Sequence, residues 1–105
     1  MYDTREEAMA ACIYESRAAR RYMKAAIRFA IAQECRKAWN MADIARTAAQ
    51  CALQAHERLR ELSEGNLTAK ELIAFNAAEI AQADATKAES AAATAVDIVV
   101  RETRN

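Results

Sequence analysis

Two stretches of the chain repeat apolar positions in alternating steps of four and three residues. This spacing places the side chains on one side of a helix that meets a neighbouring helix at the small crossing angle of a coiled coil. We therefore expect two helices that pack along these positions. They are Met41, Ala45, Ala48, Ala52, Ala55, Leu59 and Leu62 in the first stretch, and Ala74, Ala78, Ala81, Ala85, Ala88, Ala92, Ala95 and Val99 in the second.

Alanine fills most of these positions, which favours close contact between helices. Small side chains on both surfaces let two helix axes approach toward the short end of the range of about 8–10 Å. A buried methyl contributes only about 0.8 kcal/mol, against roughly 1.5–3 kcal/mol for a large aliphatic side chain. The alanine-rich seams therefore need support from larger groups, such as Ile73, Ile80 and Ile98 on a neighbouring stripe of the second helix.

The N-terminal part of the chain predicts a further helix. Thr4 and Glu7 match a capping box at its start. Apolar residues then recur at helical spacing, so this helix can form the third wall of a bundle. These residues are Met9, Cys12, Ala19, Met23, Ala26, Ile27 and Ala30.

The segment SEGNLTAKEL marks the boundary between the last two helices. A left-handed Gly65 can close one helix, and Thr68 with Glu71 forms a capping box for the next. Leu67 and Leu72 occupy the positions of a hydrophobic staple. The helices on either side are expected to be antiparallel neighbours.

The boundary between the first two helices is less clearly marked. Asn40 is a candidate N-cap, and Trp39 and Ile44 are spaced as a hydrophobic staple around it. We predict a break there. The alternative is one continuous helix from about residue 5 to residue 63, roughly 90 Å long at about 1.5 Å per residue, which would make the protein a long helical hairpin.

Composition supports helix along the whole chain. The 105 residues include 28 alanines, a single glycine and no proline, which leaves little turn chemistry for a sheet. We expect an all-α single domain over residues 1–105. Its architecture is a three-helix up-down-up bundle with close-packed alanine-rich seams and helices at about 5–38, 41–63 and 69–102.

These helix lengths predict self-association. The outer helices would be about 51 Å long and the middle one about 35 Å, so each outer helix would extend past it at one end. The overhanging ends carry apolar side chains, among them Met9, Ile13, Val96 and Val100. We expect a homodimer or larger assembly that covers them. The alternative is a monomer in which the first helix is bent or broken.

Local charge is more informative than net charge, because 15 basic and 15 acidic residues cancel. One stripe on the first helix is wholly basic and has no acidic residue three or four positions away, so its like charges repel at a cost of about 0.2–0.5 kcal/mol per pair. A solvated face, an acidic protein surface and nucleic acid each could offset that cost. We call this the basic stripe: Arg17, Arg20, Arg21, Lys24 and Arg28.

No residue pattern predicts catalysis, a cofactor or a metal site. His56 is the only histidine and has no metal-binding companion at helical spacing. Cys12, Cys35 and Cys51 form no CxxC pair. With neither a secretory signal nor an apolar run of membrane-spanning length, we expect a cytoplasmic protein that does not bind membranes.

We therefore expect a non-catalytic protein-interaction module of the inhibitor, antitoxin, immunity or adaptor type. The basic stripe would supply electrostatic contacts to another protein with an acidic surface, and Tyr14 and Trp39 would serve as aromatic anchors. The alternative is a nucleic-acid-binding helical dimer that uses the same stripe for phosphate contacts.

Overall fold

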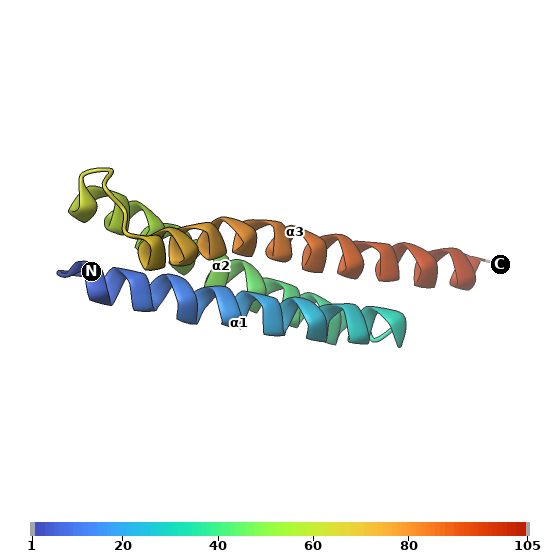
Figure 1. The fold of residues 1–105 in the computed structure, drawn as a ribbon. Coiled ribbons are helices and arrows are strands. Elements are labelled where there is room, and N and C mark those ends of the chain that lie inside the picture. Colours follow the sequence, from blue (N-terminus) through green and yellow to red (C-terminus); the bar gives the residue numbers. More distant parts are fainter. Residues whose placement is uncertain (1, 105) are drawn as a thin grey trace.

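The computed structural model describes residues 2–104, which form three helices and no strand: α1 (Arg5–Ile31), α2 (Cys35–Ser63) and α3 (Ala69–Arg104). Successive helices run in opposite directions, so α1 and α3 are parallel to each other and antiparallel to α2 (Figure 1). Each helix packs against both of the others, in a rod of 58 × 18 × 16 Å. The predicted all-α class with three packed helices is confirmed.

The first turn lies earlier than predicted. Residues 32–34 form it, and Gln33 adopts a left-handed φ of 60°. The Glu34 N–H donates to the Phe29 carbonyl at 2.9 Å, the six-to-one bond of a Schellman motif that closes α1. The predicted break at Asn40 is wrong, since Asn40 lies inside α2. The alternative of one continuous helix is also wrong, because the turn at residues 32–34 separates α1 from α2.

Burial on both sides of Asn40 explains the error. Ala38 and Ala42 are fully buried in a cluster that also contains Ala26 from α1 and Ala92 from α3. A helix that began at residue 41 would remove Ala38 from this cluster. Asparagine in a helix interior costs only a few tenths of a kcal/mol, so packing outweighs the weak local capping signal.

The second turn lies where the sequence predicts it. Thr68 and Glu71 form the expected capping box: the Glu71 N–H donates to Thr68 Oγ1 at 3.2 Å, and the Thr68 N–H donates to Glu71 Oε1 at 2.9 Å. Glu64 and Gly65 both have positive φ, 53° and 83°. The left-handed residue that directly follows α2 is therefore Glu64, with Gly65 after it.

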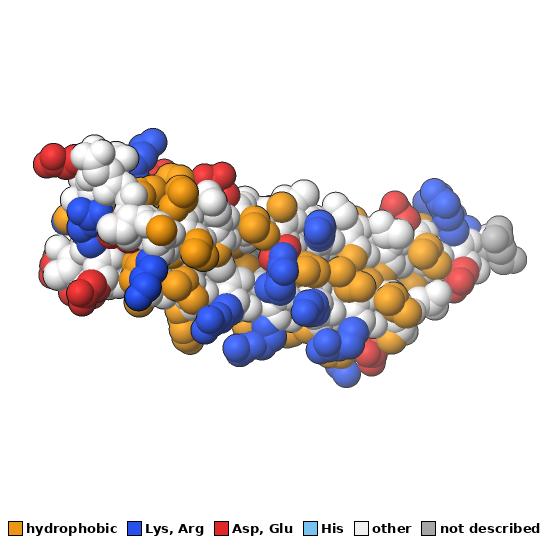
Figure 2. All heavy atoms as spheres, in the orientation of Figure 1, with side chains coloured by type: hydrophobic (Ala, Val, Ile, Leu, Met, Phe, Trp, Pro, Cys, Tyr) orange, Lys and Arg blue, Asp and Glu red, His pale blue; other side chains and the backbone are white. Residues whose placement is uncertain are grey.

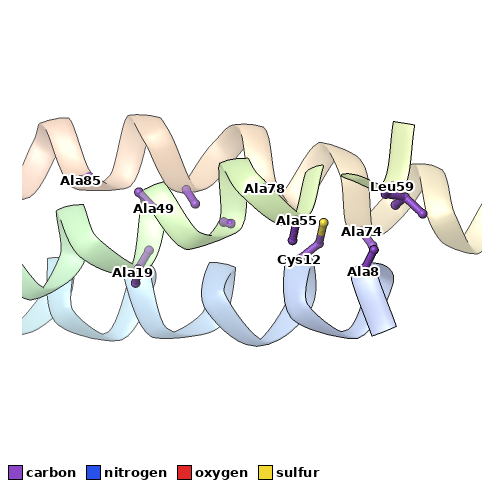
Figure 3. Close-up of a cluster of buried hydrophobic side chains, with 12 residues drawn as sticks. Ala8, Cys12, Ala19, Ala49, Ala55, Leu59, Ala74, Ala78 and Ala85 are labelled. Atoms are coloured by element: carbon purple, nitrogen blue, oxygen red, sulfur yellow. The ribbon is translucent and has the colours of Figure 1, made fainter. Parts of the chain in front are cut away.

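Alanine dominates the interior. Figure 3 shows small side chains from all three helices converging on the axis of the bundle, with Leu59 and Cys12 among the larger ones. On α3 the residues with at most 2% exposure include one set that follows the predicted four-three spacing. We call it the buried stripe of α3: Ala74, Ala78, Ala81, Ala85, Ala88, Ala92 and Ala95.

The ends of the rod differ from the expected overhangs. The start of α1 does not project, because α2 is as long as α1 and the buried Ala8 and Cys12 pack in the main core cluster. α3 has 36 residues against 27 in α1, and its C-terminal end extends past the first turn (Figure 1). Val100, near the C-terminal end of α3, is 41% exposed.

Candidate functional site

A second stripe of α3 lies one residue before the buried stripe, on the side toward α1, and most of its residues are exposed, although Asp84 is buried. It keeps the same four-three spacing, but isoleucine, charged or threonine side chains occupy six of its eight positions, and alanine only two. Ile73 is 69% exposed and Ile80 is 51% exposed. We call it the groove stripe of α3: Ile73, Ala77, Ile80, Asp84, Lys87, Ala91, Thr94 and Ile98.

α1 contributes a matching stripe on its side toward α3. Its residues also follow four-three spacing, with isoleucine at both ends and basic residues in the middle. Ile31, the last of them, is 78% exposed. We call it the groove stripe of α1: Ile13, Arg17, Arg20, Lys24, Ile27 and Ile31.

The two stripes border one shallow groove, the α1/α3 groove. Figure 2 shows hydrophobic side chains along the boundary between α3 and α1, with Lys and Arg side chains beside them along α1. At one end Ile13, Ile73 and Ile80 line an open cavity of about 320 Å³. At the other end a cavity of about 330 Å³ is lined mainly by apolar side chains, including Ile27, Ile31, Ala91 and Ile98.

An ion pair joins the two stripes between these apolar ends. Arg20 Nε lies 3.1 Å from Asp84 Oδ2, and Arg20 Nη2 lies 3.4 Å from Oδ1. Asp84 is only 1% exposed, whereas the Arg20 side chain is half exposed. A buried carboxylate without a partner would be costly, so the pairing with Arg20 stabilises Asp84. Part of the Arg20 side chain remains accessible at the centre of the groove.

The predicted basic stripe divides into two groups. Arg17 and Arg20 line the groove, and Lys24 lies between them and Ile27 on the same stripe. Arg21 and Arg28 lie farther round α1, away from α3. Within residues 2–104, Arg20 is the only member of the basic stripe that forms an ion pair.

The two predicted aromatic anchors lie apart. Tyr14 is 71% exposed and borders a shallow depression with Arg17 and Arg21, so it adjoins the basic stripe. Trp39 is on α2, seven residues before Arg46, whose guanidinium pairs with Glu89 of α3. Residues seven apart share a helix face, so Trp39 lies on the side of α2 that faces α3 and does not join the basic stripe.

Sequence reasoning missed several groove residues. Ile73, Ile80 and Ile98 were expected only to support the alanine seam, yet they face the groove and are well exposed. Asp84 pairs with Arg20 of the basic stripe, a contact within the chain that the spacing of charges on α1 alone does not predict. Lys87 was not singled out. The four-three spacing one residue before the buried stripe is the signal that identifies all of them.

Other chemically active groups lie in structural settings. Burial raises the pKa of the Cys12 thiol to about 11, which keeps it protonated at neutral pH. His56 stacks on Phe75 with ring centroids 3.5 Å apart, and its Nε2 lies 3.3 Å from Glu79 Oε1. Among residues 2–104, no three His, Cys, Asp or Glu side chains gather as metal ligands would.

No protein-family model, curated protein or solved structure matches the chain. Within residues 2–104, none of the helices is both long enough and apolar enough to cross a bilayer. The candidate site is the α1/α3 groove, because it combines exposed isoleucines at both ends with basic side chains between them.

Proposed function

We propose that this protein is a non-catalytic interaction module that binds a carboxylate-rich segment of another protein in the α1/α3 groove. The observation that supports this most directly is the combination of exposed isoleucines with basic side chains that lack partners within residues 2–104. Interfaces combine apolar anchors with complementary charge in this way. Inhibitor, antitoxin, immunity and adaptor proteins all act through such contacts, and the three free cysteines fit a reducing compartment such as the cytoplasm.

The position of the arginines favours protein over nucleic acid. Arg17 and Arg20 lie in the same cavity as Ile13, Ile73 and Ile80. A phosphate backbone would satisfy the guanidinium groups but would leave the isoleucines exposed to water. An amphipathic protein segment covers both. Nucleic acid remains the second candidate because the basic stripe could still supply phosphate contacts.

Binding to two polyanions separates these candidates. The probes are a random copolymer of glutamate, leucine and alanine, and a DNA duplex, each titrated at low and at physiological salt. We expect the copolymer to bind and the duplex not to displace it. Duplex binding that weakens steeply with salt and displaces the copolymer would overturn the proposal in favour of nucleic acid.

Two double variants of equal charge provide the matched control. R17A/K24A removes two basic groups from the groove stripe of α1, whereas R21A/R28A removes two from the outer part of the same helix. We expect the first variant to lose copolymer binding and the second to keep most of it. Equal losses would mean that total charge, rather than the groove, drives association.

We also propose that the protein self-associates through the C-terminal end of α3, which extends past the first turn (Figure 1); Val99 and Val100 belong to the last two turns of this helix. Covering exposed apolar side chains with a second copy removes them from water, which favours association. The mass in solution at micromolar concentration tests this: twice the chain mass is expected, and V99S/V100S should return the monomer. A wild-type monomer at that concentration contradicts the dimer.

A further inference from the structure

We propose that the occupant of the α1/α3 groove is one continuous α-helix of another protein, with apolar residues at both ends and carboxylates in its middle turns. This inference rests on the proposed function and specifies the partner's form and pattern. Three features carry it: the spacing of both groove stripes, the order of apolar and charged positions along them, and the sign of the charge.

The spacing indicates a helical occupant. Both groove stripes repeat at four and three residues over the length of the groove, which is the periodicity that a helix presents to a neighbouring helix. α3 thus carries a second stripe of this spacing beside the buried one, and most of its residues, though not Asp84, remain exposed or half-buried in the isolated bundle. A helix lying in the groove would meet α1 and α3 together, as the fourth helix of a four-helix bundle meets its two neighbours.

The order of residues defines two apolar anchors with a polar centre. The first anchor lies near Ile73 and Ile80, and the second lies near Ala91 and Ile98. The midpoints of these pairs are 18 residues apart on α3, or about 27 Å at about 1.5 Å per residue. A partner helix must therefore place its own apolar clusters about five turns apart, and an occupant that reaches both needs roughly 25 residues.

The charge of the centre specifies carboxylates. Four basic side chains and one carboxylate lie on the two stripes between the anchors, and Arg20 pairs with that carboxylate. The remaining basic groups are Arg17, Lys24 and Lys87, none of which forms an ion pair within residues 2–104. Glutamates in the middle turns of the occupant would pair with them.

The same charge argues against a second copy as the occupant. Two grooves placed face to face would bring Arg17, Lys24 and Lys87 of one copy against the same residues of the other. Like charges opposed at an interface cost several kcal/mol. The groove and the projecting end of α3 therefore serve different partners.

Three synthetic helical peptides of about 25 residues test the pattern. The first has leucines in its terminal turns and glutamates in its middle turns. The second has the same composition, with all glutamates moved to one end, and the third is the first peptide with a central proline that breaks the helix. Affinity is measured by fluorescence anisotropy with the full chain and with R17A/K24A and R21A/R28A.

We expect the first peptide to bind at least about tenfold more tightly than the second or the third, a difference of about 1.4 kcal/mol. R17A/K24A should remove that preference, and R21A/R28A should keep it. Circular dichroism of both variants checks that they remain folded. I73S/I80S, at the first apolar anchor, should independently weaken binding of the first peptide.

The outcomes distinguish this inference from the proposed function. If all three peptides bind equally and R17A/K24A weakens them all, the groove binds acidic protein, but the helical pattern is wrong. If the second peptide binds best, the polar centre is misassigned and the inference is also wrong. If no peptide binds, both proposals fail.

Discussion

The two stripes of α3 are offset by one residue in sequence and differ in how far their apolar side chains are buried. The buried stripe consists of alanine, and its members are at most 2% exposed. The groove stripe begins one residue earlier and carries Ile73, Ile80 and Ile98, all well exposed. The smallest apolar side chains are thus inside the bundle and some of the largest are outside. This contrast holds along these two stripes and not for the whole fold, since Ala83 on the same helix is exposed and Leu59 of α2 is fully buried.

Under the proposed function, this difference assigns folding to one stripe of α3 and binding to the other. Alanines in the interior let the helices pack, while the isoleucines outside contribute apolar surface that the isolated chain leaves in water. Substitutions in the two stripes should therefore have different consequences. Four predictions follow from the comparison, beginning with the largest change in stability.

Enlarging the buried stripe should be the most damaging change. Ala85→Leu inserts three carbon atoms at a fully buried position, and overpacking of this kind typically costs about 1–3 kcal/mol. Ala83→Leu is the matched control, because Ala83 is exposed on the same helix and leucine is nearly as good a helix former as alanine. Chemical denaturation measures both. Similar free energies of unfolding for the two variants would contradict a tightly packed interior.

Breaking the ion pair that joins the stripes should cost less. Arg20→Ala leaves the buried Asp84 carboxylate without its partner, and we expect a loss of about 1–2 kcal/mol because the Arg20 side chain is itself half exposed. Arg21→Ala removes the same charge at an exposed position and should be nearly neutral. Restoration of stability in the R20A/D84A double variant would show that the unpaired carboxylate causes the loss.

Acid should weaken the end of the rod where α3 begins. The Arg5 guanidinium and the Thr68 N–H hold the pKa of Glu71 near 2, below its ordinary value of 4.5. A lowered pKa in the folded state gives stability that is complete above the ordinary pKa and is lost as pH falls through 4.5 toward 2. Glu71→Gln should be less stable at neutral pH and should converge with the wild type near pH 2.

A control at the far end of α3 checks this assignment. Glu102 is exposed and forms no ion pair in the described part of the chain. Glu102→Gln should follow the wild-type dependence of unfolding free energy on pH at every point. If Glu71→Gln also runs parallel to the wild type, Glu71 is not a source of the acid sensitivity.

Truncating the groove stripe should change stability least. Ile73→Ala and Ile80→Ala remove exposed side chains, so the free energy of unfolding should change by no more than about 0.5 kcal/mol. Affinity for the apolar–acidic–apolar peptide should nevertheless fall. A loss of stability above about 1 kcal/mol in either variant would place that isoleucine in the core of the isolated chain.

The helical class and the second turn could be predicted from sequence because their signals are local. Thr68 and Glu71 form a capping box within four residues of each other. The first turn could not be predicted in this way, because the left-handed residue there is Gln33 and no glycine marks the position. The burial of Ala38 depends on how it packs against other helices, including Ala92 of α3, which lies far away in sequence.

The candidate site was predictable in part. Like-charge spacing within one helix identified the basic stripe, but the division between Arg17 and Arg21 depends on where α3 lies against α1. The pairing of Arg20 with Asp84 spans 64 residues. Periodicity alone cannot predict that pairing. It identifies which residues share one face of a helix, but it does not identify which other helix that face contacts.

The alanine interior also affects how stability responds to temperature. Unfolding exposes apolar surface and raises the heat capacity, typically by about 12–15 cal/mol/K per residue. Methyl groups expose less such surface than leucine or phenylalanine side chains would, so the increment per residue should fall below that range. The curve of unfolding free energy against temperature should then be shallow, with cold denaturation displaced far below freezing.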